Sequence, residues 1–194
     1  MNTFKSAAGA AAIAAAVGGI LYGIFFVLLG NVGVASALLM LGGLLSSLII
    51  VALGTTLLEI NEPVARWAII VGVVGSILSV VHGGFDLANV IHPPNTPLVD
   101  LPNFADPRGL ATFGISGLAY FTLARLMSRS REYPRWLSST GQALGIIMIV
   151  IYLGRLIILD PTNPVVRIAL VLGVAANTVF FLGLGREWRP DRTA

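Results

Sequence analysis

Six runs of about twenty apolar residues fill most of the chain, and they limit what it can fold into. A helix rises 1.5 Å per residue, so each run matches the roughly 30 Å hydrocarbon core of a bilayer. Runs such as Leu48 to Leu53 do not alternate apolar and polar residues, which argues against the strands of a membrane β-barrel. The predicted helices cover residues 6–29, 32–58, 64–91, 107–127, 139–159 and 164–184.

The composition supports the same interpretation. Only 11% of the residues are charged and 56% are hydrophobic, whereas soluble domains carry about 25% charged residues. We therefore predict one all-α transmembrane domain, a six-helix bundle over residues 1–194 in contact with the lipid bilayer. The first apolar run is about 24 residues long, longer than the core of a signal peptide, so we expect it to be retained as a helix.

The basic residues predict an orientation, because cytoplasmic loops of membrane proteins are enriched in Lys and Arg. If both ends of the chain are cytoplasmic (N-in, C-in), nine of the 12 basic residues lie inside and three outside. Those inside are Lys5, Arg66, Arg125, Arg129, Arg131, Arg135, Arg186, Arg189 and Arg192; those outside are Arg108, Arg155 and Arg167. Because this charge sits at helix ends, as an orientation signal does, we expect no nucleic-acid partner.

The third predicted helix has one small and polar face. At 100° per residue an arc of about 80° holds Gly75, Ser79, His82, Asp86 and Asn89, and apolar residues such as Ile77, Val81 and Phe85 lie outside it. An ionisable group left in hydrocarbon costs several kcal/mol. We therefore expect this face to point toward protein or toward a wet cavity.

Further polar residues are predicted at the same, extracytoplasmic level of the bundle. The predicted cluster consists of His82, Asp86, Asn89, His92, Arg108, Tyr152 and Arg155. Within it, Asp86 and Arg155 are expected either to form a structural ion pair between two helices or to line a ligand pocket. The two histidines lack a familiar metal-ligand spacing, and we predict neither a metal nor another cofactor.

Proline marks the loop after the third helix. Five prolines from Pro93 to Pro107 disfavour helix there, and we expect this loop to cover the mouth of the bundle. Asp106-Pro107 and Asn163-Pro164 each resemble a helix cap followed by the first helical residue.

Small residues repeat every four positions in the first helix, at Ala11, Ala15, Gly19 and Gly23. Such a stripe lets another helix approach closely. We expect packing within the chain, the alternative being an interface with a partner membrane protein or with a second copy.

Two short stretches resemble known families. The stretch HGGFDLANVIHPP, residues 82–94, resembles one in uncharacterised bacterial six-helix membrane proteins, which implies the bacterial inner membrane but no activity. Gly114-Ile115-Ser116-Gly117 resembles the G-x-S-G element of rhomboid proteases, in which Ser116 would be the nucleophile. The sixth helix carries Asn177 where that family has a general-base histidine, so we expect Ser116 to serve helix packing.

Three functions remain open. The first is the binding or passage of a small solute at an extracytoplasmic polar pocket between the third, fourth and fifth helices. The second is a non-catalytic accessory or scaffold subunit of a larger membrane complex. The third is an intramembrane enzyme that uses His82 and Asp86, although no complete catalytic set is found and we favour a non-enzymatic role.

Overall fold

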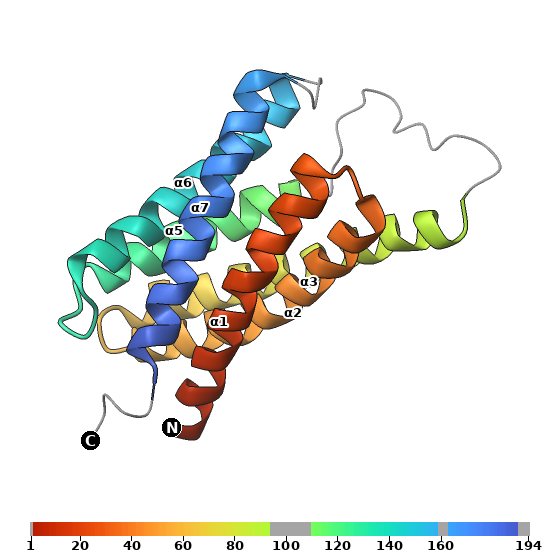
Figure 1. Cartoon of the computed structure of the whole chain (residues 1–194). Coiled ribbons are helices and arrows are strands. Elements are labelled where there is room, and N and C mark those ends of the chain that lie inside the picture. The colour runs from red at the N-terminus through yellow and green to blue at the C-terminus, as the bar shows by residue number, and fades with distance from the viewer. Residues whose placement is uncertain (1, 94–109, 159–162, 190–194) are drawn as a thin grey trace.

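The computed structural model describes residues 2–93, 110–158 and 163–189, and these form helices joined by short turns (Figure 1). No strand occurs among them. Two of the helical segments, η1 and η2, are π-helices, one following α1 and one preceding α5. The elements are α1 (Asn2–Gly23), η1 (Ile24–Leu28), α2 (Val32–Thr56), α3 (Glu62–Ile91), η2 (Leu110–Ile115), α5 (Ser116–Met127), α6 (Arg135–Ile157) and α7 (Pro164–Glu187).

Among the described residues, five helices are long and apolar enough to cross a membrane, which fits a multi-pass membrane protein. They are Thr3–Leu28, Val32–Thr56, Glu62–Ile91, Arg135–Gly154 and Pro164–Glu187. The predicted run 107–127 is described from Leu110, where η2 leads into α5. The predicted proline-rich cap lies outside the described residues, apart from His92 and Pro93.

Asparagine and proline set several helix boundaries. The Asn31, Asn61 and Asn163 side chains cap α2, α3 and α7 by accepting hydrogen bonds from backbone N–H groups. This confirms the predicted cap at Asn163-Pro164; the predicted cap at Asp106-Pro107 lies outside the described residues. Pro134 precedes α6, which begins at Arg135 and not at the predicted 139, because the proline ring fixes a φ that suits a helix start.

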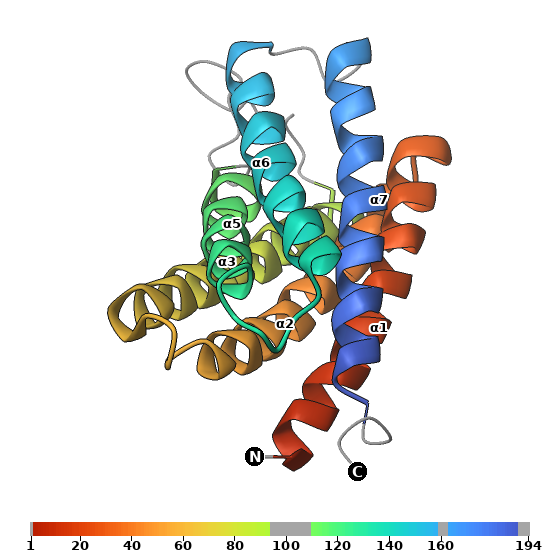
Figure 2. The same cartoon turned by 90° about the vertical axis from the view of Figure 1, so that its left-hand side faces the viewer.

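The helices form a closed ring. From α1 to α3 each helix packs on the next, α3 packs on η2 and α5, and α5, α6 and α7 follow in turn. The last helix then packs against the first, so that α7 lies beside α1 (Figure 2). Gly30, with a φ of 63°, makes the tight turn that returns α2 alongside α1, a neighbour relation that the short connection predicts.

The two ends of the ring differ. We call the end at which α1 begins and α7 ends the packed end, and the opposite end, which carries His92 and Ile157, the open end. Toward the open end α6 and α7 diverge from α2 and α3 (Figure 1, Figure 2). The fully buried large side chains gather toward the packed end and include Leu57, Leu123, Met127, Leu137, Phe180 and Leu184.

Hydrogen bonds join three elements at the packed end. The Tyr133 hydroxyl, in the turn between α5 and α6, lies 2.8 Å from Thr56 Oγ1 and accepts a bond from Trp188 Nε1 at 3.3 Å. The Lys5 ammonium contacts the Glu132 carboxylate at 2.6 Å. The end of α2, the turn before α6 and the end of α7 are therefore tied to one another.

The predicted polar face of α3 points into the bundle. Ser79 is buried and His82 is largely buried, whereas Ile77 and Val81 are more than half exposed. The outward residues form an apolar surface of the kind that lipid covers. The hydrophobic periodicity therefore predicted the facing of α3 correctly.

Glycines allow the helices to approach closely where they cross. A Cβ on Gly75 would stand 2.5 Å from Ser116 Oγ, and one on Gly43 would stand 2.6 Å from the Ser76 carbonyl oxygen. The small-residue stripe of α1 is likewise used within the chain. Ala11 and Ala15 are buried, and Gly23 packs against Val174 of α7. The intramolecular interpretation of that stripe is confirmed for these residues.

Candidate functional site

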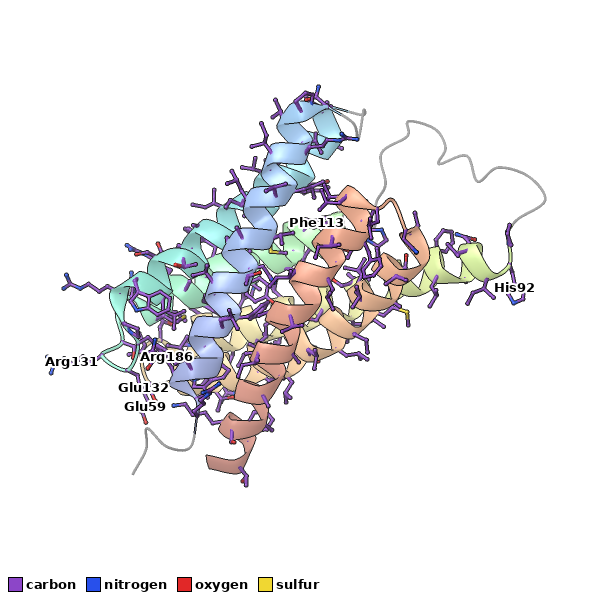
Figure 3. All side chains as sticks on the ribbon, viewed as in Figure 1. Glu59, His92, Phe113, Arg131, Glu132 and Arg186 are labelled. Atoms are coloured by element: carbon purple, nitrogen blue, oxygen red, sulfur yellow. The ribbon has the colours of Figure 1, made fainter. Side chains whose placement is uncertain are left out.

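A cavity of about 150 Å³ lies between the helices of the ring and is only partly enclosed. Each α-helix contributes to its wall, and so does η2 through Thr112 and Phe113, the second of which is labelled in Figure 3. Most of the wall is apolar, formed by side chains such as Leu39, Leu144 and Met148 and by glycines of α1 and α2. A cavity of this volume holds a molecule of roughly benzene size.

Uncharged polar side chains interrupt this apolar wall. They are the hydroxyl groups of Tyr22, Ser46, Ser76, Ser79, Thr112, Ser116 and Tyr120, and the amide of Asn177. Among the described wall residues none carries a charge. An ion would have to leave its hydration shell without a counter-charge, at a cost of many kcal/mol. The wall therefore suits an uncharged ligand.

Several of these hydroxyl groups donate their hydrogen within the protein. Ser76 and Ser79 donate to carbonyl oxygens four residues earlier in α3, at 2.8 and 2.9 Å. The Tyr120 hydroxyl is hydrogen-bonded to the Ser46 side chain, which joins α5 to α2 across the cavity wall. Because a bound serine hydroxyl retains free lone pairs, the wall presents mainly hydrogen-bond acceptors at these positions.

His82 and Asp86 lie next to the cavity, behind Thr112. His82 Nδ1 is 2.8 Å from Thr112 Oγ1, and His82 Nε2 is 3.4 Å from Asp86 Oδ2. If Nδ1 accepts the Thr112 hydroxyl hydrogen, the hydrogen of a neutral His82 lies on Nε2, the ring nitrogen nearer Asp86. The chain Asp86, His82, Thr112 fastens α3 to η2 and orients the Thr112 oxygen at the cavity wall.

The other predicted cluster residues are placed as follows. Asn89 and Tyr152 are half-buried, on α3 and α6. His92 is exposed at the far tip of α3, away from the cavity (Figure 3). Arg108 and the side chain of Arg155 lie outside the part of the chain that the structure describes, so the Asp86 to Arg155 pair stays a prediction.

The cavity differs from the predicted pocket, because none of the described residues of the predicted cluster is among its wall residues. That pocket was placed between the third, fourth and fifth helices, whereas α1, α2 and α7 also line the cavity. Sequence reasoning missed Tyr22 and Ser46 as wall residues. Their signal was weak, because one aromatic residue or one serine in an apolar helix commonly serves packing alone. Ser116 contacts the Gly75 backbone, as the packing interpretation expects.

Comparison with protein-family models, with curated proteins and with solved structures gives no match.

Proposed function

We propose that this protein is a six-helix membrane protein with both ends on the cytoplasmic side, in a bacterial inner membrane, and that it binds a small uncharged solute in the central cavity. In addition to the five long helices, η2 together with α5 forms the remaining span, the fourth in chain order. These two elements cover Leu110 to Met127 without a break. The packed end is then cytoplasmic. Arg131 and Arg186 gather there (Figure 3), in agreement with the enrichment of basic residues in cytoplasmic loops.

The observation that carries this proposal is the cavity itself. Protein interiors are close-packed, and helices that cross at glycines could close such a space with slightly larger side chains. Here Gly18 and Gly42 line the cavity, and a Cβ on either would meet nothing within 4 Å. Side chains at these two positions would therefore enter open space at the cavity. This supports a role for the space in binding, with passage of the solute as a further step.

Benzyl alcohol is a suitable first probe, because it is uncharged and of the right size. Titrated onto the purified protein in lipid nanodiscs, it is expected to stabilise the fold by about 1.4 kcal/mol at ten times its Kd. The measurement is the thermal unfolding midpoint. Gly42→Leu fills the cavity and should abolish the shift.

Gly154→Leu is the matched control. Gly154 also has open space at its Cβ position but is absent from the cavity wall, so this variant should respond as the unmodified protein does. Benzyl alcohol also acts on the bilayer, and the decisive quantity is therefore the difference between the two variants. An equal midpoint shift in both would contradict binding in the cavity.

The chain Asp86, His82, Thr112 favours a second candidate, an intramembrane enzyme. A histidine held by a carboxylate can accept a proton from a hydroxyl and activate its oxygen. Thr112 is 3% exposed and its side chain lines the cavity, where a substrate would meet it. Thr112→Ser preserves the hydroxyl group and Thr112→Val removes it.

An enzyme requires that only Thr112→Val abolish turnover, followed with a panel of uncharged esters and amides. If both variants retain benzyl alcohol binding and neither changes any turnover, the contacts among Asp86, His82 and Thr112 serve structure alone. The accessory-subunit alternative loses its main motive, because the stripe of α1 packs inward.

A further inference from the structure

Asn177 stands apart from the other polar residues of the cavity wall. Thirteen residues separate it from Pro164 at the start of α7, which places it about 20 Å along the helix axis, deep within the apolar span. A polar side chain at that depth is costly unless it has a partner. The adjacent Thr178, by contrast, donates to the Val174 carbonyl oxygen at 2.8 Å.

The Asn177 amide has no such partner among the described residues. The hydrogen bonds within residues 2–93, 110–158 and 163–189 do not include its side chain. The amide offers two hydrogens and an acceptor oxygen. Leaving such a group unpaired away from water costs roughly 1–3 kcal/mol. A bound molecule that supplies a hydrogen-bonding group would recover that free energy.

The amide lies close against Gly19. A Cβ on Gly19 would stand 2.6 Å from Asn177 Nδ2, closer than non-bonded atoms approach, so a larger residue there would make the amide turn away from this position. The next residue, Gly18, also lines the cavity but has nothing within 4 Å of its Cβ position. The two adjacent glycines thus have different roles. Gly19 leaves room for the Asn177 amide, and Gly18 leaves part of the cavity empty.

From this arrangement we infer that Asn177, seated against Gly19, is the hydrogen-bonding anchor for the ligand, which is an uncharged molecule with an apolar body and one polar group. The inference rests on the proposed binding function and names the ligand class. The apolar body lies against the wall formed by residues such as Leu144 and Met148, and the polar group meets the Asn177 amide.

The test compares two probes that share a ring and differ in one hydroxyl group. Fluorine NMR measures the Kd values of para-fluorobenzyl alcohol and para-fluorotoluene for the protein in nanodiscs, each corrected for partitioning into the same lipid. One hydrogen bond to the anchor should favour the alcohol by roughly tenfold. Asn177→Leu should remove this preference, whereas para-fluorotoluene should still bind.

Gly19→Ala and Gly18→Ala form a matched pair. A methyl group at position 19 displaces the amide, so the preference for the alcohol should fall toward that of Asn177→Leu. The same methyl group at position 18 enters open space, and the preference should persist. This pair also keeps the test decisive if Asn177→Leu does not fold.

Three results would count against the inference. If neither probe binds the unmodified protein, the proposed function fails and the anchor fails with it. If both probes bind but the alcohol has no advantage, the cavity binds ligands and Asn177 does not select them. If Gly18→Ala and Gly19→Ala changed the preference for the alcohol equally, the contact between Gly19 and Asn177 would not matter for binding.

Discussion

The packed end and the cavity are formed by the same helices, but their polar side chains differ in their hydrogen-bond partners. At the packed end Tyr133, Thr56 and Trp188 bond to one another, and bulky side chains fill the remaining space. At the cavity the hydroxyl groups of Ser76 and Ser79 bond only within their own helix, and the Asn177 amide has no partner among the described residues. Tyr120 and Ser46 do bond to each other across the cavity wall, but the Asn177 amide remains available to a ligand.

The largest expected difference between the two ends is in side-chain packing. Phe180 is fully buried against Tyr120 and Phe181, with ring centroids 6.1 and 5.7 Å away. Phe180→Ala should lower the free energy of unfolding by about 3–5 kcal/mol. Ile157→Ala, at the open end, removes a side chain that is 78% exposed and should change it by less than about 0.5 kcal/mol. Denaturant titration in mixed micelles measures both, and similar losses would erase the distinction between the ends.

An intermediate effect is expected at alkaline pH. Burial raises the pKa of Tyr133 from 10.0 to about 12, so the folded state holds the neutral phenol. The resulting stabilisation, roughly 3 kcal/mol, is complete below pH 10 and is lost as the pH rises to about 12.

Tyr133→Phe should remove this pH dependence and also cost about 1–2 kcal/mol at neutral pH, because Thr56 and Trp188 lose a partner. The unfolding free energy as a function of pH, for both proteins, is the measurement. Parallel curves above pH 10 would show that ionisation of Tyr133 does not change the free energy of unfolding.

The smallest effect is expected from the ion pair of Lys5 and Glu132. Both side chains are accessible to solvent, at 25% and 48%, so the pair should contribute less than about 1 kcal/mol. Lys5→Met should therefore leave the unfolding midpoint nearly unchanged, and high salt should have as little effect. A loss comparable to that of Phe180→Ala would mean that charge, and not packing, holds this end together.

The sequence predicted the features that depend on local pattern. Length and hydrophobicity gave the helical segments, the period of 3.6 residues gave the inward face of α3, and Asn163-Pro164 gave the start of α7. These follow from neighbours along one helix, so they need no knowledge of tertiary contacts.

The features that depend on how helices meet were not predictable in the same way. The bond between His82 and Thr112 joins residues 30 positions apart, and the seat of Asn177 on Gly19 joins the last helix to the first. Many glycines in the chain share the same local pattern, and only tertiary packing separates Gly19 from Gly18. The position of the cavity also depends on how the helices pack together, so the pattern of a single helix could not predict it.

The contact between α1 and α7 has a consequence for biosynthesis. The first helix to be synthesised, α1, packs against the last, α7. Gly19 and Asn177 lie on the two sides of this contact. A nascent chain that lacks α7 has no finished binding site, so the solute cannot stabilise it. Ligand would then act only on chains whose final helix has been inserted, and would distinguish finished molecules from truncated ones.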